Sequence, residues 1–160
     1  MNLSFETSVV GNTAYTASSS NFRILDVSNP ATPFKIGSYN PVLTFSAEDV
    51  NIIGNTAYVS TTSFSTETGE LLILDISDSS TPVLLGNYGV SEPLYKIDVT
   101  GNTAYIITES GLQIINVSNP NTPTLTGSYS TQGPPSNVSV IENTAYISGG
   151  PRGLAILQLN

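Results

Sequence analysis

The sequence Gly11-Asn12-Thr13-Ala14-Tyr15 occurs again at 54–58 and at 101–105, and a fourth copy at 142–146 begins with Glu instead of Gly. Successive copies are 43, 47 and 41 residues apart. This spacing is too long for one turn of a β-helix, and the segments between the copies lack the helical faces of ankyrin or tetratricopeptide repeats. It matches the length of a four-stranded propeller blade.

Two further motifs recur with the same period and divide each repeat into four strand-like runs. Run A precedes the Gly-Asn turn, run B follows it, run C is an Ile-Leu-Asp segment, and run D leads into Gly-Ser-Tyr. We therefore expect an all-β propeller of four-stranded antiparallel blades. The copies of run C are at 24–30, 73–78, 114–120 and 156–160, and those of the Gly-Ser-Tyr motif are at 37–39, 86–88 and 127–129.

The apolar pattern of each run predicts how deeply it is buried. Residues 71–74 of run C are apolar at both alternating positions, so this strand is expected between two neighbouring sheets. In run D, Leu125 and Tyr129 are expected to share one side, which is typical of an outer, half-solvated strand. The recurring tyrosines are expected in the core between blades; they are Tyr15, Tyr58, Tyr105 and Tyr146.

The turns follow from residue chemistry. Gly-Asn between runs A and B supplies the positive-φ residues of a tight hairpin. Asp26, Asp75 and Asn116 end run C, where their side chains can form Asx turns, and a following Pro stops strand pairing. We expect turn capping rather than metal ligation, because Asn in the third copy and Gln158 in the fourth are weaker ligands.

The repeat, from Gly111-Leu112 through Ser118-Asn119-Pro120 to Gly127-Ser128-Tyr129, closely resembles the LVIVD repeat, a family of bacterial and archaeal propeller blades. The resemblance covers essentially the whole chain, although 79–80 are Ser-Ser where other copies begin with Pro. It implies an extracytoplasmic, often surface-attached protein and brings no catalytic motif. We expect one propeller unit over 1–160, with repeats at about 1–40, 41–89, 90–130 and 131–160.

The composition excludes several functions. The 160 residues include no Cys, His or Trp, so there is no disulfide, thiol nucleophile, Ser-His-Asp triad or Cys/His zinc site. Four basic against twelve acidic residues, with a net charge of −8, oppose binding to nucleic acid. No segment has the ~20 apolar residues of a membrane span, so no membrane insertion is expected.

Catalysis would depend on carboxylates, as in glycoside hydrolysis. Glu48 and Asp49 are adjacent and point to opposite sides of a strand, and Glu67 and Glu70 lie in a polar insert. We therefore expect a non-catalytic protein that needs no cofactor. Its Ser, Thr and Asn content and its scarcity of Lys suit an extracellular or cell-surface location, and no signal peptide is expected in the residues before run A.

The fourth repeat has runs A, B and C but no run D, so its last strand, 154–159, is expected to be an exposed apolar edge. Natural proteins cover such edges. A second copy could do so, for instance as two halves of an eight-bladed ring. The alternatives are the rest of a longer propeller, from which this chain is a piece, and a lone four-bladed ring.

Length variation between repeats is confined to the B–C and D–A connections, which strand alternation places on one face of a propeller. Because variable loops on a rigid scaffold often bind partners, we expect an interaction face with the candidates Phe45, Phe64, Tyr95 and Arg152. The plain alternative is that these aromatics pack beneath their own loops. Two functions stay open: a scaffold that binds proteins, and a module that binds a glycan or cation at this face or in the central channel.

Overall fold

The computed structural model describes residues 6–18, 21–40 and 46–159, and these form strands and turns with no helix able to cross a membrane. This confirms the all-β prediction. The strands are β1 (Thr7–Val10), β2 (Thr13–Ser18), β3 (Asn21–Asp26), β4 (Phe34–Tyr39), β5 (Ser46–Ile53), β6 (Thr56–Ser63), β7 (Thr68–Asp75), β8 (Val83–Val90), β9 (Leu94–Thr100), β10 (Thr103–Thr108), β11 (Gly111–Asn116), β12 (Thr124–Ser130), β13 (Pro135–Ile141), β14 (Thr144–Gly149) and β15 (Leu154–Gln158).

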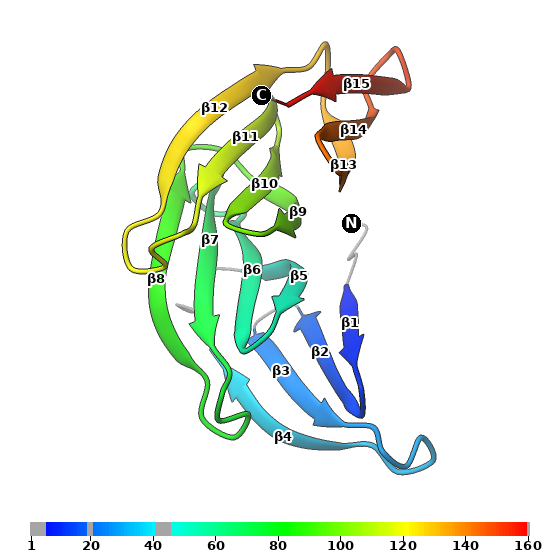
Figure 1. Cartoon of the computed structure of the whole chain (residues 1–160), viewed down its shortest axis with the longest axis vertical. Coiled ribbons are helices and arrows are strands. Elements are labelled where there is room, and N and C mark those ends of the chain that lie inside the picture. Colours follow the sequence, from blue (N-terminus) through cyan, green and yellow to red (C-terminus); the bar gives the residue numbers. More distant parts are fainter. Residues whose placement is uncertain (1–5, 19–20, 41–45, 160) are drawn as a thin grey trace.

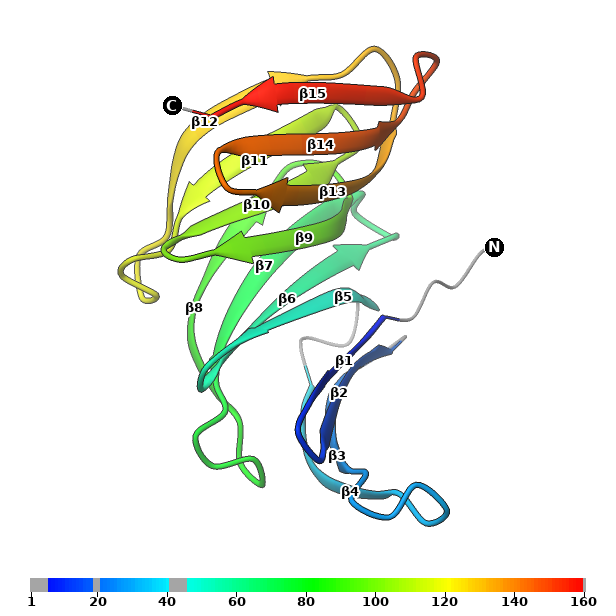
Figure 2. The same ribbon diagram turned by 45° about the vertical axis from the view of Figure 1, so that its right-hand side comes forward.

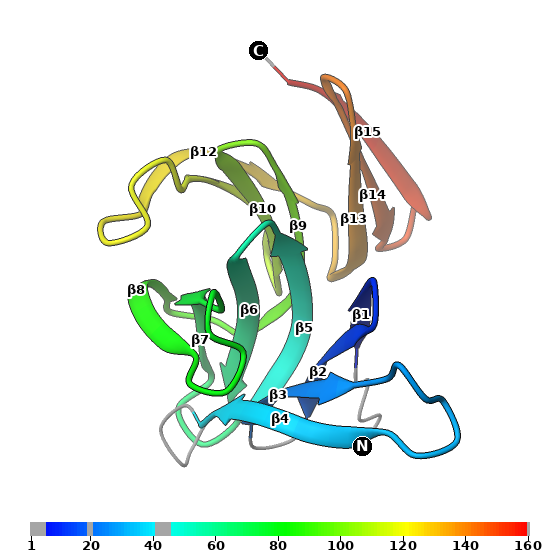
Figure 3. The same ribbon diagram turned by 60° about the horizontal axis from the view of Figure 1, so that its bottom comes forward.

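The strands form four antiparallel sheets, which are the blades of a propeller (Figures 1 and 2). Blades 1 to 3 each contain four strands in chain order, β1–β4, β5–β8 and β9–β12, whereas blade 4 contains β13–β14–β15. Figure 3 shows that the first strand of each blade lies nearest the centre and that the last lies outermost. Runs A to D therefore become successive strands from the centre outward, and blade 4 lacks its outer strand in the described residues.

The A–B turns are tight because their first residue adopts a left-handed backbone. The φ angles are 59° at Gly11, 57° at Gly54, 58° at Gly101 and 53° at Glu142. The following Asn does not share this conformation in any of the four turns, so a single positive φ, rather than the expected pair, closes each hairpin. Glu142 carries a steric cost that the three glycines avoid.

Replacing Glu142 with Gly is expected to raise the free energy of unfolding by about 0.5–1 kcal/mol, because relief of the left-handed strain exceeds the added chain entropy of Gly. Urea denaturation measures this change. Gly54→Ala introduces the same strain and is the matched control. An added Cβ at Gly54 meets no atom within 4 Å, so the expected decrease in the free energy of unfolding, of similar size, reports backbone strain alone. A Glu142→Gly variant no more stable than the parent would contradict the explanation.

Each blade packs against the next through one hydrophobic cluster. We call the side of a blade that carries the recurring tyrosine its Tyr face, and the opposite side, which carries the preceding Ala, its Ala face. The Tyr face of each of blades 1 to 3 packs against the Ala face of the following blade. Between blades 3 and 4, for example, Tyr105, Ile107 and Leu112 contact Ala145 and Ile147. Residues 71–74 of run C in blade 2 are buried on both sides, as predicted, because blade 2 has a neighbouring blade on each face.

The outer strands contain a recurring β-bulge. In blade 3, Ile115 pairs with Leu125 but Ile114 pairs with Gly127, so Thr126 is an extra residue. Equivalent shifts occur in the outer strands of blades 1 and 2. Because one extra residue reverses the alternation, Leu125 and Tyr129 lie on opposite faces, and the prediction that they share a side is wrong.

The residues at the end of run C cap their own turns, as predicted. In three copies the side-chain oxygen accepts a hydrogen bond from the backbone N–H two residues later. Hydrogen bonds from Ser28 and from Ser77 lower the pKa values of Asp26 and Asp75. The bonds are Ser28 N to Asp26 Oδ1 at 2.7 Å, Ser77 N to Asp75 Oδ1 at 2.8 Å and Ser118 N to Asn116 Oδ1 at 2.9 Å.

Candidate functional site

The B–C and D–A connections lie on one face of the propeller, as the strand alternation predicts. Ser110, in the B–C connection of blade 3, donates its N–H to Oε2 of Glu92 in the preceding D–A connection at 2.9 Å. At the opposite ends of the strands, the residue after run C bonds to the A–B turn, as when Val27 N donates to Asn12 O at 2.9 Å. The variable connections therefore share a loop face.

The four candidate residues of the loop face do not form one site. Phe45 lies outside the described residues. Phe64 is 53% exposed in the turn between β6 and β7, Tyr95 is half-buried near the start of β9, and Arg152 is exposed in the turn between β14 and β15. These three residues belong to three different blades, and no hydrogen bond or ion pair between described residues joins them.

The longest B–C insert is mostly an extension of the hairpin. Strand β6 continues to Ser63 and β7 begins at Thr68, so only 64–67 form the turn. Glu67 lies in this turn with φ 54°, and Glu70 lies in β7, where its Oε1 accepts a hydrogen bond from Asn87 at 3.3 Å. The insert therefore places its two carboxylates at separate positions on a rigid hairpin.

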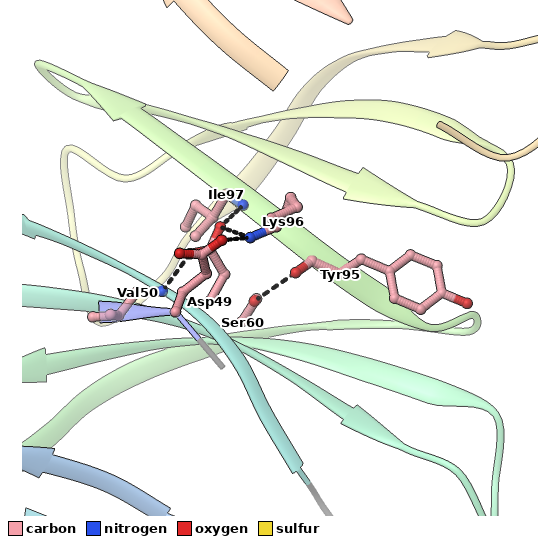
Figure 4. A network of polar contacts seen from close by, with 7 residues as sticks. Asp49, Val50, Ser60, Tyr95, Lys96 and Ile97 are labelled. Carbon is pink, nitrogen blue, oxygen red and sulfur yellow. Dashed lines mark hydrogen bonds and ion pairs between the residues drawn. The ribbon is translucent and has the colours of Figure 1, made fainter. Parts of the chain in front are cut away.

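The inner strands carry a charged network that the sequence reasoning did not identify as a unit (Figure 4). Asp49 Oδ1 accepts the N–H of Val50 at 2.8 Å, and its Oδ2 accepts the N–H of Ile97 in the next blade at 3.0 Å. Lys96 Nζ lies 3.9 Å from Asp49 Oδ2 and forms an ion pair with Glu6, which precedes β1. The network therefore links the inner strands of blades 1, 2 and 3. We call Glu6, Asp49 and Lys96 the axial network.

Burial dominates the electrostatics of Asp49. It raises the pKa of this carboxyl to about 6, against the opposing effects of the Ile97 N–H and the Lys96 charge. Glu48, at the bulge of β5, also has a pKa raised by burial. Asp98 makes a similar link one blade further on, because its Oδ2 accepts the Val140 N–H at 2.6 Å. These aspartates therefore join β5 to β9 and β9 to β13.

A signal for this network is present in the sequence. When the runs A are aligned on their Gly-Asn turns, Asp49 and Lys96 occupy the same position in successive repeats. Positions aligned in this way surround the axis of a propeller. Among the described residues, no three acidic side chains are grouped as metal ligands would be. The contacts of the axial network connect three successive blades, which is the geometry of a structural clamp.

The end of the blade array exposes a second, apolar surface. No blade follows the Tyr face of blade 4 in the part of the chain that the structure describes, so Tyr146 is 37% exposed, whereas its counterpart Tyr105 is 9% exposed. On the same face, Leu154 is 52% and Ile156 is 59% exposed. The prediction that the recurring tyrosines are buried holds for the first three and is wrong for Tyr146, because burial requires a neighbouring blade.

The outer edge of blade 4 borders two adjoining grooves between β12 and β15. Among the described residues, strand β15 pairs with β14 alone, so its other edge is free, as predicted for 154–159. The grooves have volumes of about 320 and 470 Å³ and meet at Tyr129. Arg152 and Leu154 line the smaller groove, and Gly127 and Leu159 line the larger one.

The repeated blades and the axial clamp define a β-propeller assembled from one repeated unit. The model of the LVIVD repeat family matches residues 6–41, 46–90 and 95–131. The chain therefore belongs to the LVIVD repeat family, which confirms the resemblance seen in its motifs.

Solved structures share this fold at low sequence identity. The computationally designed protein Ika4 has a TM-score of 0.72 and 9% identity, with 96% of this chain and 89% of that chain covered. The designed protein Ika8 has a TM-score of 0.74 and 10% identity, with 96% of this chain and 45% of that chain covered. BamB from Moraxella catarrhalis has a TM-score of 0.68 and 15% identity, with 96% of this chain and 42% of that chain covered. The chain thus spans less than half the length of Ika8 and BamB. A comparison with curated protein sequences gives no match.

Proposed function

We propose that this chain is a non-catalytic repeat scaffold that binds protein through the Tyr face of blade 4, as part of a cell-surface or secreted protein. The observation that carries the proposal is the exposure of Tyr146, Leu154 and Ile156 on a face whose counterparts in blades 1 to 3 are buried, except for the half-buried Ile114. Clustered exposed apolar side chains are characteristic of protein interfaces. The extracytoplasmic location rests on the composition and on the family resemblance.

A second copy of the chain is the partner that we propose for this face. Within the chain, each Tyr face of blades 1 to 3 packs against an Ala face, and the Ala face of blade 1 is itself uncovered at Val9, which is 60% exposed. The Ala face of blade 1 in one copy can therefore pack against the Tyr face of blade 4 in the other copy. This Ala face is more polar than that of blade 2, because it carries Thr16 and Arg23 where blade 2 has Val59 and Leu72. We therefore expect reversible association of the two copies.

Light scattering across a concentration series tests this proposal. We expect the mass to approach twice 16.8 kDa as the concentration rises. Tyr146→Ala should raise the dissociation constant at least tenfold, because it truncates an aromatic anchor at the interface. Phe64→Ala is the matched control: it removes an exposed aromatic side chain from the loop face and should leave the association unchanged.

Two outcomes would contradict the proposal. A mass that stays at 16.8 kDa at every concentration would exclude the second copy as partner. Association that is lost in Phe64→Ala but kept in Tyr146→Ala would place the interface on the loop face instead.

A further inference from the structure

The glycine of each Gly-Ser-Tyr motif marks a close approach between successive blades. A Cβ added to Gly37 in blade 1 would lie 2.1 Å from the carbonyl oxygen of Ser79, in the C–D turn of blade 2. A Cβ added to Gly86 in blade 2 would lie 2.3 Å from the carbonyl oxygen of Pro120, in the C–D turn of blade 3. Both distances are shorter than van der Waals contact, so these positions admit only glycine. The glycine is thus a seat for the turn of the following blade.

The equivalent seat in blade 3 has no such turn against it in the described part of the chain. Gly127 pairs with Ile114, as Gly37 and Gly86 pair with Ile24 and Ile73. A Cβ added there would meet only the side chain of Ile114, at 3.5 Å. The larger groove, of about 470 Å³, opens at this glycine.

The seat adjoins the free edge of β15. The larger groove extends from Gly127 to Leu159, directly after β15, and the smaller groove continues past Tyr129 to Leu154 at the start of that strand. The backbone N–H and C=O groups along the outer edge of β15 have no strand partner among the described residues. In blades 1 to 3, the corresponding space holds a C–D turn followed by a fourth strand.

We propose that the Gly127 seat and the β15 edge together bind the C–D turn and fourth strand of an LVIVD-type blade supplied by another polypeptide. The incoming strand pairs with β15, and its turn rests on Gly127. This inference rests on the proposed function and names a partner segment for the outer edge of β15, which adjoins the Tyr face at Leu154. Backbone hydrogen bonds along a free edge provide affinity, and the close contact at the glycine provides specificity.

The C–D turn and fourth strand of blade 3 serve as the model for the occupant, because they carry no charge, whereas the equivalent segments contain Lys35 in blade 1 and Asp78 in blade 2. The segment 117–131 of blade 3 has an Asn-Pro turn, a strand and no charged residue. An uncharged segment avoids electrostatic repulsion by a chain with a net charge of −8. The complementary segment that we propose is an extended, neutral strand that begins with an Asn-Pro turn, as in blade 3.

A fluorescein-labelled peptide of sequence 117–131, titrated with the full chain and followed by anisotropy, tests this proposal. We expect saturable binding by the parent chain and none to a scrambled peptide. Gly127→Ala should raise the dissociation constant of the peptide at least tenfold, because the added Cβ occupies the space in which the turn of the peptide rests. The thermal midpoint of unfolding should be that of the parent chain. Gly89→Ala is the matched control: this Gly also lies in an outer strand, an added Cβ meets nothing within 4 Å, and binding should be that of the parent.

The absence of saturable binding to the parent chain, or equal affinity in the parent and Gly127→Ala, would overturn the inference. Failure here is distinguishable from failure of the proposed function. Gly127→Ala leaves the Tyr face of blade 4 intact, so a concentration-dependent dimer without peptide binding would refute only the Gly127 seat. Peptide binding by a chain that stays monomeric would refute only self-association through the Tyr face.

Discussion

Replacing Lys96 with Met is expected to lower the free energy of unfolding by about 3 kcal/mol at pH 7. The Lys96 side chain is only 17% exposed and is the cation between two carboxylates, those of Asp49 and Glu6. Its removal leaves Asp49 buried without a neutralising charge, and a buried unpaired charge is among the most destabilising changes. Urea denaturation with a constant m-value is the measurement.

A matched control separates this effect from the loss of any lysine. Lys35→Met removes a cation of the same size from an exposed position of β4, and we expect a change below about 0.5 kcal/mol. Combining Lys96→Met with Asp49→Asn should recover part of the loss, because the uncompensated charge is then absent. Equal effects of Lys96→Met and Lys35→Met would show that the axial network does not stabilise the blade array.

The second large effect is a dependence of stability on pH that arises from Asp49. Its folded-state pKa of about 6 lies above the ordinary value of 3.8, so the folded chain holds this proton more tightly than the unfolded chain does. The resulting stabilisation is fully present below pH 3.8 and is lost as the pH rises through about 6. We expect the free energy of unfolding to fall by about 3 kcal/mol across this window.

Denaturation series between pH 4 and pH 7 on two variants isolate this effect. Asp49→Asn should remove most of the dependence of the free energy of unfolding on pH. A smaller dependence should be kept, because burial also raises the pKa of Glu48. Asp26→Asn should keep the slope, since turn hydrogen bonds lower the pKa of Asp26 and move its titration below the window. A stability that is constant from pH 4 to pH 7 in the parent chain would mean that Asp49 titrates normally.

Both effects concern a network whose members are far apart in the sequence. Glu6 and Lys96 are separated by 90 residues, and Asp49 and Ile97 by 48. The sequence places Asp49 next to Glu48, where it is a catalytic candidate, and far from Lys96. Side chains at one position of successive repeats meet only when the blades surround a common axis, so their partnership depends on the curvature of the blade array.

The sequence by itself determined the period, the four runs of each repeat and the missing fourth run of blade 4. These properties follow from local chemistry: Gly at a left-handed turn position, Asx caps at the end of run C, and an apolar run for a strand between two sheets. Each is repeated in the chain, so one copy supports the interpretation of the next. The resemblance to the LVIVD family rests on the same repeated residues.

Only the tertiary structure decided which copies of a motif are covered. Tyr105 and Tyr146 have the same local sequence, yet one is buried and the other exposed, because among the described residues blade 3 has a following blade and blade 4 does not. Gly86 and Gly127 have the same strand position, yet only Gly86 faces a turn of the next blade. A repeated motif specifies the strand that it forms, whereas burial and binding depend on the neighbouring blade, which the motif does not contain.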